Sequence, residues 1–113
     1  DVILIGKSIE AMMQAFNEVK KLGGGIVLIE NEQVIASIPL TVGGLMSDLP
    51  MEQLIEQEKE LIAKLRERGF DKGDAIYSLL FLQSTHLPYI RITPKGLYDV
   101  MKKNILLPAM MRE

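Results

Sequence analysis

The sequence predicts an α/β (α+β) fold: a single domain with a mixed β-sheet that contains a β-hairpin, and two main helices packed on that sheet. Three observations support this prediction. Apolar residues recur at helical spacing in two segments, two β-rich runs flank a short polar turn, and the length of 113 residues suits one domain. Read along the chain, the expected order of elements is β-α-β-β-α-β-β.

The chain opens with the apolar run 2–5, which ends at Gly6 and is typical of a buried strand. Because the chain begins inside this run and without Met, we expect it to be a fragment of a longer polypeptide. Ser8 is expected to cap a first helix and Gly23 to end it. The apolar positions at helical spacing are Ile9, Met12, Met13, Phe16 and Val19.

The next two segments predict an antiparallel hairpin. Residues 26–29 and 34–38 are β-rich, and the polar residues 30–33 between them form the turn. Pro39 should end the second strand because it has no N–H to donate. A loop over residues 40–47 follows.

A second helix is expected after this loop, with Asp48 as its N-cap, Pro50 in its first turn and Gly69 as its stop. Its charged face should be solvated. The residues of its apolar face are Met51, Leu54, Ile55, Leu61, Ile62 and Leu65.

The remaining segments are shorter. Residues 76–82 are apolar but too few to separate strand from helix by periodicity, and we favour a buried strand. Residues 89–93 alternate and suit a strand, residues 94–96 form a turn, and residues 97–103 suit a short helix.

Composition excludes several function classes. The net charge is −2 with no basic stripe, so we expect no nucleic-acid partner. No apolar stretch reaches 18 residues, so we expect no membrane span. The absence of cysteine excludes disulfides, a thiol nucleophile and Cys-ligated zinc, and it fits a cytoplasmic protein.

Two glycine runs are candidates for anion binding. A phosphate-binding loop runs from a strand to a helix, whereas the run 23–25 follows a helix and precedes a strand, so we interpret it as a helix stop. The run at Gly43 and Gly44 has the required order, and with Ser47 and Asp48 it forms a candidate loop facing an active site. Turn geometry and helix capping also explain these four residues.

No residue is assigned as catalytic, cofactor-binding or metal-binding. His86 is the only histidine, and without Cys or nearby carboxylates it is expected to lie at a strand end or in the loop after it. Glutamates on the solvated face of the second helix lack the cleft that paired catalytic carboxylates need.

Five segments, in this order and spacing, resemble the C-terminal domain of bacterial adenine deaminases. The resemblance covers nearly the whole chain, so residues 1–113 are interpreted as one such domain. The segments are 22–29 (LGGGIVLI), 34–40 (VIASIPL), 44–48 (GLMSD), 88–93 (PYIRIT) and 96–100 (GLYDV).

The resemblance implies a parent enzyme of the amidohydrolase superfamily, which hydrolyses adenine to hypoxanthine and ammonia with a divalent metal (Mn, Fe or Zn). The metal ligands would lie on a preceding barrel domain of the same polypeptide, which is this domain's expected partner. A homo-oligomer is also expected, and the fragment alone should be inactive.

The hairpin turn, the loop before Leu45 and residues 83–86 depart from the usual family pattern. The parent could therefore act on another purine or on a cyclic amide. A non-catalytic interaction or oligomerisation module is the alternative from another class.

Overall fold

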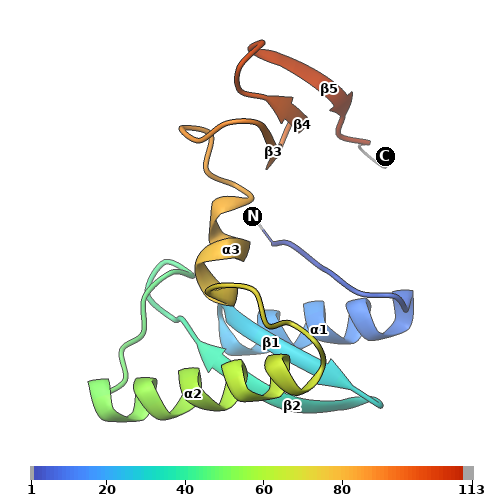
Figure 1. Ribbon diagram of the computed structural model, residues 1–113. Coiled ribbons are helices and arrows are strands. Elements are labelled where there is room, and N and C mark those ends of the chain that lie inside the picture. Colours follow the sequence, from blue (N-terminus) through green and yellow to red (C-terminus); the bar gives the residue numbers. More distant parts are fainter. Residues whose placement is uncertain (1, 111–113) are drawn as a thin grey trace. The chain divides into compact units, whose positions relative to one another are not determined.

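A computed structural model describes residues 2–110 of the chain (Figure 1). The chain divides into two compact units, residues 2–71 and the part that begins at Lys72. The first unit holds helix α1, strands β1 and β2, and helix α2, and the second holds helix α3 and strands β3, β4 and β5. The predicted α+β class is confirmed.

Helix α1, Ile9–Leu22, begins and ends where local signals place it. The Ala11 amide donates to the Ser8 hydroxyl at 3.2 Å, which makes Ser8 the N-cap. Gly23 ends the helix in the left-handed conformation, with φ of 79°, and its amide donates to the Lys20 carbonyl at 3.2 Å. Both cap predictions are confirmed.

Strands β1, Gly25–Glu30, and β2, Gln33–Pro39, form the predicted antiparallel hairpin. The turn residues Asn31 and Glu32 have φ of 50° and 62°, and two consecutive positive values are what a two-residue type I′ hairpin turn requires. Pro39 is the last residue of β2, as predicted.

Helix α2, Met51–Glu67, ends as predicted but begins differently. Asp48 is not its N-cap: Pro50 takes that position, and the Pro50 carbonyl accepts from the amides of Gln53 and Leu54. At the other end Gly69 has φ of 94°, and the Phe70 amide donates to the Leu65 carbonyl at 3.0 Å.

The first unit is assembled on the hairpin, because α1 contacts β1 and α2 contacts β2 (Figure 1). Ala36 and Ile38 of β2 and Leu61 of α2 are its buried apolar residues. The buried centre of this unit therefore lies between β2 and α2.

In the second unit, residues 75–81 form helix α3, Ala75–Phe81, so the strand predicted for 76–82 is wrong. The physical reason is local: the Asp74 carboxylate accepts from the Tyr77 amide at 3.0 Å and caps a helix. A capped start decides the conformation of a short apolar run that periodicity leaves open.

Strands β3, Ile90–Thr93, β4, Gly96–Asp99, and β5, Asn104–Pro108, form an antiparallel sheet in the order β3-β4-β5. The strand predicted for 89–93 is confirmed. The helix predicted for 97–103 is wrong, because this stretch pairs with β3 and then turns: the Asp99 carboxylate accepts from the Lys102 amide at 3.0 Å.

Two further expectations are corrected. Residues 2–5 lie in no helix or strand, although their composition suggested a strand. The strands form two separate sheets, β1-β2 and β3-β4-β5, and all their pairings are antiparallel, so there is no single mixed sheet among the described residues.

Candidate functional site

The candidate loop forms a tight turn between β2 and α2. Val42 and Met46 exchange backbone hydrogen bonds of 3.0 and 3.2 Å, and the Leu45 amide donates to the Val42 carbonyl at 3.3 Å. Gly43 and Gly44 have φ of 65° and 74°, which glycine adopts without steric cost. Because the Leu45 and Met46 amides already donate to the Val42 carbonyl, they are not free to donate to a bound anion.

The two glycine runs, treated separately in the sequence, meet in the structure. A Cβ added to Gly24 would lie 2.8 Å from Gly44 Cα and 2.9 Å from the Leu40 carbonyl oxygen. The Leu40 amide also donates to the Gly24 carbonyl at 3.0 Å. The end of α1 therefore holds the loop by direct backbone packing, which only glycine at position 24 allows.

The loop presents apolar rather than catalytic side chains. Leu45 is 69% exposed, and Val42 and Met46 are exposed beside it. The Ser47 hydroxyl accepts from the Leu49 amide at 3.1 Å, so Ser47 serves the turn into α2, and Asp48 is exposed. This is a loop closed by backbone hydrogen bonds and with an apolar tip, a geometry suited to contact with another surface.

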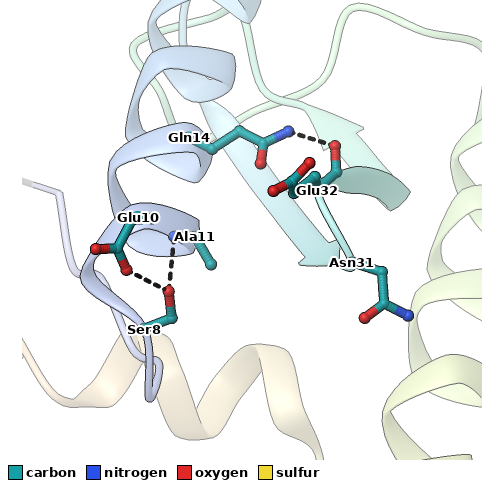
Figure 2. A pocket seen from close by; sticks show the side chains of 6 residues that line it. All are labelled: Ser8, Glu10, Ala11, Gln14, Asn31 and Glu32. Atoms are coloured by element: carbon teal, nitrogen blue, oxygen red, sulfur yellow. Dashed lines mark hydrogen bonds between the residues drawn. The ribbon is translucent and has the colours of Figure 1, made fainter.

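A hollow of about 570 Å³ lies between the start of α1 and the hairpin turn (Figure 2). Two hydrogen bonds link side chains of its lining: the Ser8 hydroxyl donates to the Glu10 carboxylate at 2.9 Å, and the Gln14 amide donates to the Glu32 backbone carbonyl at 2.7 Å. The residues that line it are Ser8, Glu10, Ala11, Gln14, Asn31 and Glu32.

Backbone hydrogen bonding at the start of α1, together with the Ser8 hydroxyl, lowers the pKa of Glu10. The carboxylate is therefore held in its charged, acceptor form, which suits a helix N-terminus and does not suit a general acid. We therefore interpret the hollow as the place where α1 packs against the hairpin turn, and not as a catalytic site.

His86 is exposed in the turn between α3 and β3. It thus follows a helix instead of the strand expected there. Within residues 2–110, no three His, Cys, Asp or Glu side chains converge as a metal site would require. The described residues therefore do not fit the divalent metal that the resemblance implies.

Sequence patterns missed an ion pair that joins α2 to the hairpin. Arg68, just after α2, donates from Nε to the Glu30 carboxylate at the end of β1, and from Nη1 to the Lys64 carbonyl at 2.7 Å. The hydrogen bond from Arg68 lowers the pKa of Glu30, and the same bond raises the pKa of Arg68. No local pattern predicts this pair, because its residues are 38 positions apart.

We expect this pair to make the first unit acid-sensitive. Since the folded-state pKa of Glu30 is depressed, its contribution is present above the unfolded pKa and is lost as pH falls through the folded pKa. Glu30→Gln should therefore lower the urea midpoint at pH 7 and leave it close to that of the unsubstituted chain at pH 3.

The matched control is Glu56→Gln, at an exposed position of α2. In this control, the difference between the urea midpoints at pH 7 and at pH 3 should be the same as in the unsubstituted chain. Equal pH dependence in the Glu30→Gln variant and the unsubstituted chain would show that the pair does not act in solution.

No helix in the described part of the chain is both long and apolar enough to cross a bilayer.

Comparison with known proteins gives one consistent result. The family described as "Adenine deaminase C-terminal domain" matches residues 1–104. The chain is 58% identical over 112 residues to a Halalkalibacterium halodurans protein and 52% identical over 112 residues to a Bacillus subtilis protein, both named "putative adenine deaminase". It is 37% identical over 106 residues to a protein of Thermosipho africanus named adenine deaminase.

These alignments cover 94 to 99% of this chain but only 18 to 19% of each relative. The chain thus spans about a fifth of the length of the curated relatives it matches. No solved structure matches the chain.

Proposed function

The chain belongs to the family of adenine deaminase C-terminal domains, and we propose that it is the non-catalytic C-terminal domain of a longer hydrolase that converts adenine and water to hypoxanthine and ammonia. The resemblance seen in the sequence is confirmed by the family match. The observation that carries the proposal is that relatives named as adenine deaminases align with this chain over only 18 to 19% of their own length.

In this proposal the reaction takes place on the other part of the polypeptide. A divalent metal (Mn, Fe or Zn) would supply an activated water there, and a barrel domain would bind it. This assignment is supported by the lack of convergent metal-ligating side chains within residues 2–110. The proposal includes a cytoplasmic location.

This chain's contribution would be a docking surface for the barrel domain. The loop formed by Gly43, Gly44, Ser47 and Asp48 is held by backbone packing on Gly24, and its tip is apolar. We propose that this loop faces the mouth of the active site, because rigidly supported loops commonly contribute to binding and catalysis. The alternative is that the longer protein acts on a substrate other than adenine, either another purine or a cyclic amide.

The experiment is an ammonia-release assay on a panel of purines and cyclic amides. The full-length polypeptide should release ammonia from adenine, and the 113-residue chain should release none with Mn, Fe or Zn. Metal-dependent ammonia release by the short chain would refute the non-catalytic role. If the full-length protein released ammonia from a different compound of the panel and not from adenine, that compound would take the place of adenine in the proposal.

The loop's role can be tested separately with Gly44→Ala in the full-length protein. Gly44 has φ of 74°, and a Cβ there meets nothing within 4 Å, so the substitution strains the loop without a clash. We expect kcat/KM for adenine to fall about tenfold, which corresponds to about 1.4 kcal/mol.

Gly69→Ala is the matched control, because Gly69 also has positive φ and open space but follows α2. It should cost similar stability and leave kcat/KM unchanged. Equal kinetic effects at the two glycines would exclude a specific role for the loop.

A further inference from the structure

The first unit exposes apolar side chains in residues 2–5 and on the first turns of α1. Ile5 is 68% exposed, Ile9 71% and Met13 49%, and Val2 is exposed as well. Because a neighbouring unit can only cover side chains, the first unit by itself exposes them at least as much. We call these four residues the N-terminal apolar surface.

The parts of this surface adjoin one another. A Cβ added to Gly6 would lie 2.9 Å from Met12 Cγ, so the segment that leads into α1 comes directly against the start of this helix (Figure 1). Ile9 and Met13 follow one turn apart on one face of the helix. The surface is therefore continuous from the segment to α1.

Helix α1 is only partly covered by the hairpin. It contacts β1, yet none of its residues is buried. Met12 and Val19 are half-buried, whereas Ile9 and Met13, further round the helix, are exposed. A helix that packs on one side only normally carries polar residues at such positions. The apolar residues there indicate a second contact.

The backbone of residues 2–7 also lacks partners. Among the described residues, no backbone–backbone hydrogen bond involves this segment. The run 2–5 has the composition of a buried strand, and buried backbone groups are nearly always hydrogen-bonded. A partner that covers this segment must therefore also exchange hydrogen bonds with its backbone.

The lengths of the relatives indicate what that partner is. Two of them align with this chain over 19% of their own length, so about four-fifths of each lies outside it. The matching family is described as a C-terminal domain, and its match begins at residue 1. The rest of such a polypeptide therefore joins this domain at the N-terminal apolar surface.

The short connection keeps this preceding part close. Ile5 is four residues from residue 1, and four extended residues span at most about 14 Å. A partner on so short a tether acts at an effective concentration on the order of millimolar. At ordinary protein concentrations, it therefore has the advantage over a separate second copy of the chain.

We propose that the N-terminal apolar surface binds the part of the polypeptide that directly precedes residue 1. That part covers Ile5, Ile9 and Met13 and exchanges hydrogen bonds with the backbone of residues 2–7. The inference rests on the proposed function only in taking the chain as the C-terminal domain of a longer polypeptide, and it requires no particular substrate. It adds a second contact to the one proposed for the loop at Gly43 and Gly44.

Met13 reports on this contact, because oxidation of methionine by hydrogen peroxide follows its exposure. Met13 should oxidise readily in the 113-residue chain and about tenfold or more slowly in the full-length polypeptide. Peptide mass spectrometry distinguishes Met13 from its neighbour Met12. As a control for the reagent, the two proteins unfolded in urea should oxidise Met13 at equal rates.

I9E tests whether the proposed contact is what protects Met13. A charge at position 9 is costly once that position is covered. In the full-length polypeptide, I9E should therefore raise the oxidation rate of Met13 towards that of the 113-residue chain. N17E is the matched control, because Asn17 is an exposed polar residue of the same helix, and it should leave Met13 protected. Equal effects of the two substitutions would overturn the proposal.

The 113-residue chain distinguishes the other possible occupants. Protection of Met13 that grows with the concentration of this chain would place a second copy on the surface. Protection at every concentration would show that the chain covers the surface itself. Either result would overturn the proposal, as would fast oxidation of Met13 in the full-length polypeptide.

Hydrogen exchange gives a measurement that needs no substitution. Amides of residues 3–6 should exchange rapidly in the 113-residue chain and slowly in the full-length polypeptide. Rapid exchange in both proteins would contradict the proposed backbone pairing, even if I9E proved too unstable to purify.

These measurements are separate from the ammonia-release assay. A full-length protein that protects Met13 and deaminates a compound other than adenine would keep this inference and change the substrate. A full-length protein that deaminates adenine but leaves Met13 and residues 3–6 unprotected would keep the proposed function and refute this contact.

Discussion

Gly25→Ala is expected to unfold the first unit, with a loss of more than about 4 kcal/mol in the free energy of unfolding. Gly25 opens β1 with φ of 140°, a conformation that side-chain-bearing residues rarely adopt. An added Cβ would also overlap the Ile38 carbonyl oxygen on β2. The oxygen belongs to the backbone of β2, and the added Cβ is fixed directly to the backbone of β1, so the clash can be relieved only by separating β1 from β2.

The neighbouring glycines provide a graded control within one run. Gly23→Ala should cost about 1 to 2 kcal/mol, because Gly23 has positive φ but open space around its Cβ. Gly24→Ala should cost about 2 to 3 kcal/mol, because it adds a 2.8 Å contact with Gly44 Cα to its backbone strain. Urea unfolding followed by circular dichroism measures all three, and equal losses would contradict the close backbone approach.

This series also shows what the sequence could predict. The helix stop at Gly23 and the hairpin after it follow from local signals, namely capping residues, β-rich runs and a polar turn, and both are confirmed. The contact between Gly24 and Gly44 is between residues 20 positions apart, and it depends on how α1 and the loop fold back on the hairpin. Signals from neighbouring residues in the sequence cannot predict that Gly24 and Gly44 come into contact.

The errors occur where two local signals compete. Residues 76–82 are apolar enough for a buried strand, but Asp74 caps a helix and decides the outcome. Residues 97–103 include good helix formers, yet Gly96 and Asp99 both favour turns, and pairing with β3 and β5 stabilises β4 instead. In both places tertiary or capping interactions override weak intrinsic preference.

For the candidate loop, the sequence predicted only its place along the chain. The structure shows a loop with Gly43 and Gly44 between β2 and α2, as expected, and its position at an active site stays a prediction. The sequence did not predict that Leu45 and Met46 form an exposed tip, because exposure depends on the packing of the whole unit. The pairing of Glu30 with Arg68 was missed for the same reason.

Leu61→Ala is expected to cost about 2 to 5 kcal/mol in the free energy of unfolding. Leu61 is 2% exposed and is the largest fully buried side chain of the described residues. It lies on α2, which packs against β2, where Ala36 and Ile38 are also buried. With so small a buried core, truncating Leu61 leaves a cavity at the centre of the helix–hairpin contact.

Ile55→Ala is the matched control on the same helix. Ile55 is 40% exposed, so the lost burial is smaller, and alanine's higher helix propensity offsets part of it. Its cost should stay below about 1 kcal/mol. If urea unfolding gave similar losses for Leu61→Ala and Ile55→Ala, the contact between α2 and β2 could not be the main source of stability in the first unit. A large loss for Leu61→Ala alone would show that the contact between α2 and β2 is the main source of stability, because only that substitution empties the buried centre.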